Sequence, residues 1–485
     1  MDVLEVGTIR SLRTINRRFD AAELDYTMQD NYDVVIAGGG PAGATAALVL
    51  ARSGLSVCVL EKDTHPRFHI GESLLPRTTP LLRELGIEAR ISALPQVTKN
   101  GAEFGFGDAE VTRKFTFNDA LIKGSAIFNV ERAVFDKALL DLAREAGAEV
   151  FENTPVRDIT HLDETDRDAN VEVRTDSGLV RGRLLLDATG QGTLVGRKLK
   201  HRRGFADPQL QKVAYFQHYE GVQRLSGDEA GHPCIVLCDE GWFWLIPIND
   251  QVTSVGFVTR PSFVRTLQVP PTAMLGWAIA RCPLVRQRLH QATGSAHNQV
   301  AADFSYRCQP YAGPGYFLLG DAACFLDPIF STGVTLAMMS GKHVADLVLR
   351  MFAGQLSART ARRQYIAFIE RSTQPFWRLI NNSYRHSFRE LFVSGGGPMQ
   401  IPGAIISVLA GQVFPRPPWA LRWRQRMFEA LVWAQQYVAL APRRAPFSLL
   451  AQAPAPLEYL LSANVGVEAQ TSPDYRNAPA TALAD

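Results

Sequence analysis

The sequence predicts an α/β fold in which a parallel sheet is interrupted by an antiparallel sheet and followed by helices. Residues 33–61 contain an apolar strand, a glycine turn, an Ala- and Leu-rich helix and a second apolar strand. Apolar strands at 184–190 and 315–323 also run into glycine turns, as parallel strands of one sheet do. Between them, residues 200–305 are rich in aromatic and β-branched runs, and residues 341–440 have helical patterns.

The first of these units carries a dinucleotide-binding pattern. Gly38 permits a tight turn, Gly40 lets the backbone approach a pyrophosphate, and Gly43 lets helix and strand pack closely. Glu61 follows about 20 residues later, where a carboxylate binds ribose hydroxyls. Amides at the helix start, that of Ala42 among them, attract phosphate. The candidate cofactor-binding residues of this unit are Gly38, Gly39, Gly40, Ala42, Gly43 and Glu61.

Three polar residues outside this unit are further candidates. Glu72 lies beside the expected cofactor loop, and its alternative role is that of a solvent-exposed carboxylate. Arg132 begins an amphipathic helix, where it could contact a cofactor phosphate or ring or be a surface arginine. Asp321 follows an apolar strand, and its carboxylate suits a hydroxyl of a ribityl chain. Further on, the amides of Thr332, Gly333 and Val334 open a helix and are placed to bind an anion.

Local signals also set expectations for individual elements. Ser73 is a candidate N-cap for a helix that runs to Leu85. The glycines at 395–397 resemble the first turn, but no β-branched strand precedes them, so we expect a loop and no second dinucleotide site. Residues 401–414 are too short to span a bilayer, which favours a core segment over a membrane-docking one. The longer expected helices are Thr335–Leu349, Ala358–Glu370, Phe376–Phe392 and Ala420–Tyr437.

Composition narrows the possible classes of protein. The chain has 485 residues, of which 46% are hydrophobic and 20% charged, as in a globular protein with a substantial core. A net charge of +3 is too small to indicate a nucleic-acid partner. The six cysteines complete no metal-binding pattern, which predicts buried thiols in a reducing compartment and no metal. The arginine-rich N-terminus lacks an apolar segment, so we expect no secretory signal and a cytoplasmic location, with Met28 as an alternative start.

Two features stand apart from the dinucleotide pattern. In residues 241–247, alternation places Trp242 and Trp244 on one face of a strand that ends at Pro247. The two indoles could pack in a core or form a rigid wall beside a site. Lys99 lies in a predicted turn, where a solvated side chain is the ordinary interpretation.

Taken together, these residues resemble the flavin-dependent halogenases, a branch of the FAD monooxygenase superfamily, over residues 31–440. The glycine turn with Glu61 and the turns at 187–190 and 320–323 are similar to those of the wider superfamily and imply only FAD. Residues 242–247 match the family motif W-x-W-x-I-P, and residues 325–333 match F-x-x-P-x-x-S-x-G. Lys99 falls where the phenol and pyrrole branch carries its catalytic lysine. Phe330 stands where the tryptophan branch has a Glu, so the resemblance favours the phenolic, pyrrolic or carrier-tethered branch.

The resemblance implies an enzyme that uses reduced FAD (FADH2), oxygen and chloride or bromide to make hypohalous acid. That acid would halogenate an electron-rich phenol or pyrrole, free or tethered to an acyl or peptidyl carrier protein, in secondary-metabolite or pigment biosynthesis. Lys99 would be catalytic, Thr332 and Gly333 would bind halide, and Val334 would meet the flavin. A partition between flavin and substrate would comprise Trp242, Trp244 and Pro247. A separate reductase would supply FADH2, and membrane association is not expected.

The implied architecture is a Rossmann-like FAD-binding domain of the glutathione-reductase and hydroxybenzoate-hydroxylase type, with an inserted antiparallel-sheet substrate domain and a C-terminal helical region. The expected boundaries are an N-terminal extension at 1–30, the FAD-binding domain at 31–199 and 306–350, the substrate domain at 200–305, the helical region at 351–451 and a disordered tail at 452–485.

Two other functions were weighed against halogenation. One is an FAD-dependent hydroxylase or reductase of the same superfamily, which should lack the tryptophan wall or the lysine. The other is a catalytically inactive flavoprotein with a membrane or partner-binding role, suggested by residues 401–414 and the nearby arginines.

Overall fold

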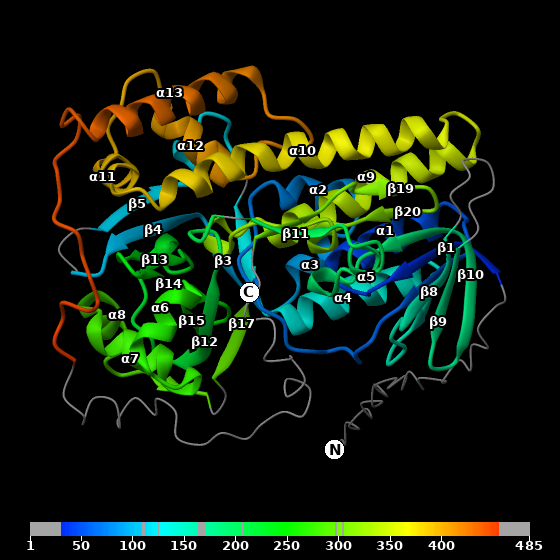
Figure 1. The fold of residues 1–485 in the computed structure, drawn as a ribbon, viewed down its shortest axis with the longest axis horizontal. Coiled ribbons are helices and arrows are strands. Elements are labelled where there is room, and N and C mark those ends of the chain that lie inside the picture. Colours follow the sequence, from blue (N-terminus) through cyan, green and yellow to red (C-terminus); the bar gives the residue numbers. More distant parts are fainter. Residues whose placement is uncertain are drawn as a thin grey trace, which may run out of the picture.

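The computed structural model describes residues 31–108, 112–124, 126–162, 171–205, 207–295, 298–302 and 305–454. The predicted N-terminal extension, Met28 and nearly all of the predicted tail lie outside these residues. Two large sheets lie side by side, and long helices pass over both (Figure 1).

The first sheet is built on parallel strands. β1 (Asn31–Ala37) lies at its centre and pairs in parallel with β2 (Val57–Leu60) and with β10 (Gly178–Asp187). Val34, Val35 and Ile36 have no exposed surface, as expected for a parallel strand covered on both faces. β10 continues in parallel to β20 (Tyr316–Leu318), which confirms that both later apolar strands join this sheet. The remaining strands are β7 (Glu149–Phe151), β8 (Asp158–Leu162), β9 (Val171–Thr175) and β19 (Ala312–Gly313).

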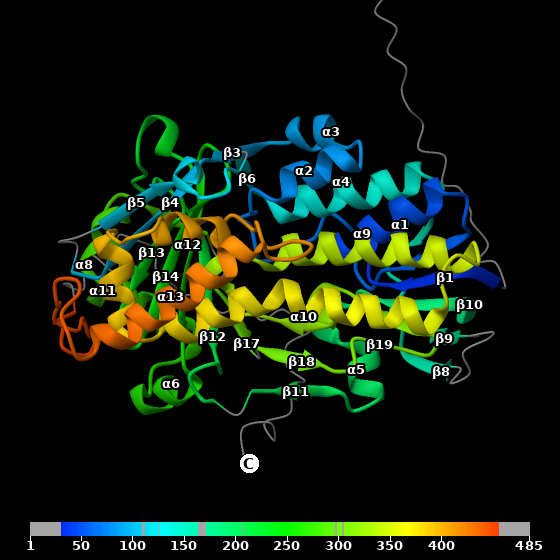
Figure 2. The same cartoon turned by 90° about the horizontal axis from the view of Figure 1, so that it is seen from above.

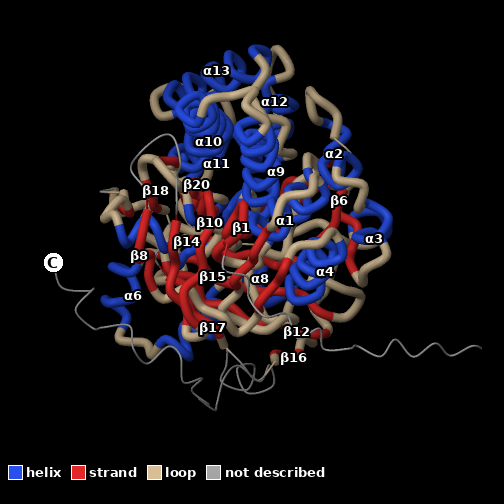
Figure 3. Tube along the Cα trace, turned by 90° about the vertical axis from the view of Figure 1, so that its right-hand side faces the viewer, coloured by secondary structure: helices blue, strands red, loops and turns tan. Residues whose placement is uncertain are grey.

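Three helices pack against this sheet, as the end-on view shows (Figure 3): α1 (Pro41–Arg52), α4 (Arg132–Glu145) and α9 (Gly333–Phe352). The start of α1 lies so close to the end of β1 that a Cβ on Gly43 would come 2.0 Å from the carbonyl oxygen of Gly38. Gly38 itself has a φ of +104°, which favours glycine. The fold therefore requires glycine at two of the positions that the dinucleotide pattern singled out.

The shorter helices around this sheet are α2 (Thr78–Glu84), α3 (Glu88–Ser92) and α5 (Leu194–Lys198). The prediction that Ser73 caps a helix was wrong, because α2 begins only at Thr78 and Ser73 instead bridges to Asn129. Asn129 belongs to β6 (Ile127–Val130), which pairs with β3 (Gln96–Lys99) in a two-stranded sheet. A further small sheet comprises β11 (Arg202–Gly204), β18 (Tyr306–Cys308) and β21 (Cys324–Phe325).

The second sheet is largely antiparallel and has β14 (Gly241–Pro247) near its centre. Trp242 and Trp244 face the main core, whereas Phe243 and Leu245 face a separate cluster, in agreement with the alternation in the sequence. That cluster is closed by the helices α6 (Pro261–Leu267), α7 (Met274–Arg281) and α8 (Pro283–Arg288). The other strands from the 200–305 segment are β12 (Val213–Glu220), β13 (Cys234–Leu237), β15 (Val252–Thr259), β16 (Thr293–Gly294) and β17 (Gln299–Ala302).

Two strands of this sheet come from a part of the chain assigned to the FAD-binding domain on sequence. β4 (Gly101–Phe106) pairs in parallel with β13, and β5 (Thr112–Thr116) pairs with β4. β4 and β5 thus belong to the second sheet, although residues 31–199 were expected to belong to the first domain. No local pattern predicts this pairing, because a strand of alternating residues can join either sheet.

The C-terminal region is helical. Seen from above, α9 and α10 (Ala358–Ser383) run side by side, and the later helices lie over the second sheet (Figure 2). α10 continues through Pro375, so the two helices expected at 358–370 and 376–392 are one long helix followed by α11 (His386–Ser394). α12 (Ile401–Leu409) is mostly buried, in line with the core interpretation, and α13 (Trp419–Gln435) packs on it. None of the helices in the described ranges has the length and apolarity that a membrane span needs.

Candidate active site

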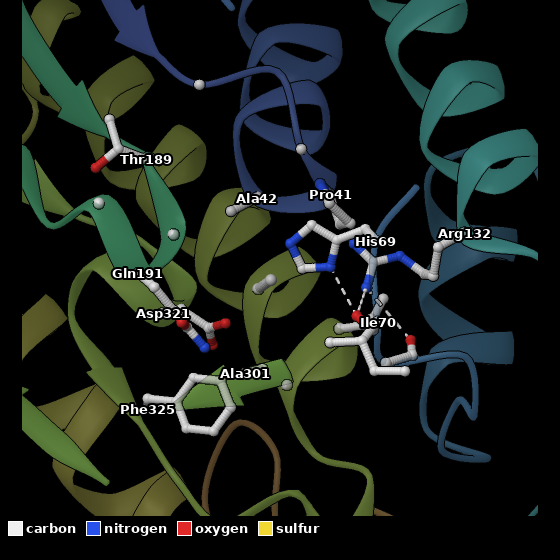
Figure 4. Close-up of a pocket in the computed structure, with 18 of the residues that line it drawn as sticks. Pro41, Ala42, His69, Ile70, Arg132, Thr189, Gln191, Ala301, Asp321 and Phe325 are labelled. Atoms are coloured by element: carbon white, nitrogen blue, oxygen red, sulfur yellow. Dashed lines mark hydrogen bonds between the residues drawn. The ribbon is translucent and has the colours of Figure 1, made fainter. Parts of the chain in front are cut away.

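A cavity of about 930 Å³ lies at the carboxyl ends of the first-sheet strands, against the second sheet. Ligands of open α/β sheets bind at this edge. The lining comes from the ends of β1 and β2, the loop before α2, the start of α9, and the main-core face of β14. In Figure 4, Gln191, Asp321 and Phe325 lie on one side of the cavity, and His69, Ile70 and Arg132 lie on the other.

The glycine turn and Glu61 form the end of the cavity beside β1 and β2. Glu61 is 3% exposed and accepts hydrogen bonds from the backbone N–H groups of Gly39 (2.6 Å) and Asp63 (3.0 Å). A carboxylate can accept about four hydrogen bonds, so Glu61 retains capacity for hydroxyl donors. A Cβ at Gly40 would meet no atom closer than 3.7 Å from it, which leaves the space beside this residue to the cavity.

Arg132 lies at the start of α4 and is 5% exposed. Its Nε and Nη2 donate to the two carboxylate oxygens of Asp136 at 2.7 and 2.8 Å, and its Nη1 donates to the carbonyl oxygens of Ile70 (2.8 Å) and Gly71 (3.3 Å) (Figure 4). Arg132 therefore lines the cavity, but its donors are used on Asp136 and on the loop at 70–71.

Asp321 and the start of α9 line the opposite side. Burial raises the pKa of Asp321, and the positive charge of Arg132 opposes this rise, so that the pKa is about 6. Thr332, Gly333 and Val334 line the same region. Gly333 lies close to Asp321, because a Cβ added to Gly333 would lie 3.9 Å from Asp321 Oδ1. The first amides of this 20-residue helix have no intrahelical acceptor and point along the positive end of the helix dipole, which favours an anion.

Glu72 is also part of the lining, and it is buried (2% exposed) rather than solvated. Its Oε1 lies 2.7 Å from Nε2 of His218 on β12, a partner that sequence analysis did not identify. Its Oε2 has no hydrogen-bond partner among the described residues. A buried carboxylate oxygen without a partner is costly, so it marks a place where a bound polar group would be stabilised.

The two tryptophans of β14 line the cavity from the side of the second sheet. Trp242 and Trp244 are 2% and 5% exposed, and their rings are 5.9 Å apart between centroids. Trp244 Nε1 donates to Ser254 Oγ at 3.1 Å, which fixes the indole. Pro247 lies at the far end of β14, opposite Thr253 of β15, and is not among the residues that line the cavity.

Lys99 ends β3 instead of lying in a turn, and it is 4% exposed instead of solvated. Its Nζ donates to Ser73 Oγ (2.9 Å) and to the carbonyl oxygen of Leu74 (3.0 Å), and lies 5.5 Å from the centre of the Phe117 ring. No carboxylate of the described residues forms an ion pair with Lys99. Burial lowers the pKa of Lys99 to about 7. Ser73 lines the cavity and Lys99 does not, so the amine lies directly behind the cavity wall.

Comparison with known proteins identifies the family. Residues 31–360 match the family model described as an FAD binding domain. The 1H-pyrrole-2-carbonyl-[peptidyl-carrier protein] chlorinase of Pseudomonas fluorescens is 30% identical over 383 residues, covering 73% of this chain and 84% of the relative. The corresponding brominase of Pseudoalteromonas luteoviolacea is 34% identical over 327 residues, covering 67% and 79%. The solved structure of the flavin-dependent brominase Bmp2 superposes with a TM-score of 0.74 and 28% identity, covering 84% of this chain and all (100%) of that chain.

The chain belongs to the flavin-dependent halogenase family. FAD is therefore the cofactor of this halogenase, and a halide is its co-substrate. The cavity fits FAD: Gly40 faces open space, Glu61 has hydrogen-bonding capacity to spare, and Glu72 Oε2 is unpartnered. Membership of the family supports halogenation over hydroxylation or reduction.

Several residues of the site were not foreseen from the sequence of this halogenase. Arg67 lies 3.8 Å from Glu61, and His218 holds Glu72. Gln191 lies beside Asp321 at the cavity (Figure 4). The Asp187–Gly190 turn, noted only as an FAD feature, leads directly to Gln191. The position just after this turn could therefore have marked Gln191 as a candidate site residue.

Proposed function

We propose that this halogenase acts on an electron-rich aromatic ring, a phenol or a pyrrole, with Lys99 as the catalytic residue. The two pyrrole-specific relatives are named for a substrate carried on a peptidyl carrier protein, which supports a tethered pyrrole as the first substrate to test. When bound, reduced FAD would supply the two electrons that activate oxygen, and the activated oxygen would oxidise the halide to hypohalous acid.

The observation that carries this proposal is the environment of Lys99. Its amine is buried, has neutral hydrogen-bonding partners and lies behind the wall of the FAD cavity. Because burial brings its pKa to about 7, a large fraction of the amine is neutral at neutral pH. A neutral amine can hydrogen-bond hypohalous acid or bind its electrophilic halogen, whereas an ammonium ion offers no lone pair.

The remaining residues would control where the oxidant forms and travels. The amides of Thr332 and Gly333 would hold the halide, with Val334 against the flavin, because the start of α9 favours an anion at that point. Trp242 and Trp244 would keep the organic substrate away from the flavin, which suppresses hydroxylation. Pro247 would act only by ending the strand that carries them.

A separate flavin reductase would supply the reduced cofactor, since the sequence carries one dinucleotide pattern and residues 395–398 form a loop rather than a second one. The remaining alternative, an inactive flavoprotein with a binding role, predicts FAD binding without turnover.

To test this proposal, the purified protein is incubated with reduced FAD, oxygen and either chloride or bromide. Phenols and pyrroles are offered free and bound to a carrier protein, and mass spectrometry looks for the halogen isotope pattern. Halogenated product is the expected result. Hydroxylated product would favour a monooxygenase, and bound FAD with no product from any substrate would favour the inactive flavoprotein.

Lys99→Ala should abolish halogenation while FAD binding and oxygen consumption by the reduced flavin persist. Lys114→Ala is the matched control, because Lys114 is an exposed lysine on the neighbouring strand β5. Halogenation retained in Lys99→Ala would refute the role of Lys99 and leave the family assignment intact.

A further inference from the structure

His232 is a buried histidine that the chemistry described above does not use. It is 4% exposed, and its Nδ1 and Nε2 both lack a hydrogen-bond partner among the described residues. Leaving buried polar atoms unpaired is costly, so such atoms mark a place that a water or a ligand occupies. Burial also lowers the pKa of the imidazole, so the ring is neutral at neutral pH and keeps one nitrogen as a proton acceptor.

The ring of His232 lies against the segment that carries Lys99. A Cβ on Gly101 would come 2.9 Å from Cε1 and 3.0 Å from Nε2 of His232, so the glycine leaves the space that the ring occupies. The preceding Gly231 is equally close to the same segment, since its Cβ would lie 2.0 Å from the carbonyl oxygen of Thr98. His232 and Lys99 therefore approach each other from two chain segments that are held together by close backbone packing.

The charged groups that act on His232 are Glu229, Lys99, Glu103 and Lys114. Glu229 and Lys114 form an ion pair with each other at 2.6 Å. Glu103 is held by Arg288 at 3.0 Å. Within the described residues, Lys99 is thus the one member of this set without an ionic partner, and it and His232 can both be neutral at neutral pH.

Electrophilic halogenation of an aromatic carbon requires a base, because the halogen replaces a ring proton. We propose that His232 is the base that accepts this ring proton while Lys99 delivers the halogen, an inference that rests on the proposed function. The ring carbon forms a bond to the halogen as the halogen–oxygen bond of hypohalous acid breaks. The ring proton passes to His232 and then to the departing hydroxide, which leaves as water. His232 is neutral again at the end, and hypohalous acid is the sole oxidant.

The test compares His232→Gln with the wild type and with His343→Gln. His343 is a matched control, because it is also a histidine with an unpartnered buried nitrogen, but it lies in α9 and stacks on Phe368 of α10. Each protein receives reduced FAD, oxygen and bromide with either phenol or ring-deuterated phenol. A parallel reaction measures hypohalous acid with monochlorodimedone as a chemical trap.

The expected result for His232→Gln is phenol bromination slowed by about 100-fold, the lower end of what acid–base catalysis contributes, with bromination of the trap unchanged. Ring-deuterated phenol should also react more slowly than phenol in this variant alone, because loss of the ring proton becomes rate-limiting. Equal loss of phenol and trap bromination, full retention of both, or slowing without an isotope effect would each overturn the proposal. Absence of trap bromination in the wild type would instead refute the proposed function.

A second measurement does not depend on a variant or on FAD. In the wild-type protein labelled with ¹⁵N-histidine, 4-chlorophenol should shift the imidazole resonances of His232 and leave those of His343 unchanged. Unchanged His232 resonances at saturating 4-chlorophenol would show that the ring does not contact the substrate, and would overturn the proposal.

Discussion

Replacing Lys99 by methionine should stabilise the protein while removing its activity. The side chain is buried, and its pKa is lowered from 10.5 to about 7, so the folded state binds the proton less tightly than the unfolded state. At about 1.4 kcal/mol per pH unit, burying this group costs about 4 kcal/mol at pH 7 and about 2 kcal/mol at pH 9. The cost falls as pH rises from 7 to 10.5, because the folded protein is already losing this proton at pH 7, whereas the unfolded chain loses it only as pH approaches 10.5.

Methionine has a similar shape and no charge, but it also loses the two hydrogen bonds to Ser73 and Leu74. These bonds contribute about 1 kcal/mol each, which offsets part of the gain. Lys99→Met should therefore be about 2 kcal/mol more stable than the wild type at pH 7 and about equal to it at pH 9.

The assay is urea unfolding of the FAD-free protein at both pH values, followed by tryptophan fluorescence. Lys114→Met serves as the control, because an exposed ion pair such as that of Lys114 contributes at most about 1 kcal/mol. A Lys99→Met protein that is less stable than the wild type at pH 7, or a difference that does not shrink by pH 9, would refute the argument that Lys99 is held in a destabilising environment.

Four further predictions concern the fold, the cofactor and the reaction. Gly43→Ala should destabilise the fold by more than about 3 kcal/mol, the upper end for ordinary overpacking, because its Cβ would clash with the Gly38 carbonyl oxygen at 2.0 Å; thermal unfolding measures this. Gly40→Ala, whose Cβ has 3.7 Å of clearance, should keep the stability of the wild type but bind FAD more weakly in a fluorescence titration, and unchanged FAD affinity would mean that the cofactor does not approach Gly40. The halogenation rate at saturating substrate should fall as pH drops through about 7, since protonation removes the lone pair of Lys99; a rate that is flat from pH 6 to 8 would contradict this. Trp242→Ala should give hydroxylated product beside the halogenated one by mass spectrometry, because the cavity would then admit substrate to the flavin, and halogenated product alone would count against the wall.

The parts of the fold predicted from sequence are those with a local cause. The turn requires glycine at Gly38 for its positive φ and at Gly43 for the close approach of α1 to the Gly38 carbonyl. The common face of Trp242 and Trp244 follows from the two-residue period of a strand. Pro375 misled the prediction of α10 because tertiary packing of the long helix outweighs the local cost of an internal proline.

The parts that could not be predicted depend on pairing between distant segments. Lys99 was expected in a turn because its neighbours Asn100 and Gly101 favour one, whereas β3 forms only through pairing with β6, about thirty residues later. Glu72 and His218 are 146 residues apart in the sequence, and no pattern near either residue predicts their contact. Lys99 and Glu72 are both buried charged residues. A single sequence indicates the burial of a charged residue poorly, because charged residues are mostly exposed.

The path of the chain between the two sheets has a consequence for protein engineering. β4 and β5 form one edge of the second sheet, beside β13, and the other strands of this sheet come from residues 213–302, so the second sheet is not a single insertion that can be cut out. A chimera that exchanges the substrate-facing half with a relative must transplant two chain segments together, one of which begins within two residues of Lys99. Any such exchange places a junction beside this amine. A change of the donor sequence would therefore also change the surroundings of Lys99.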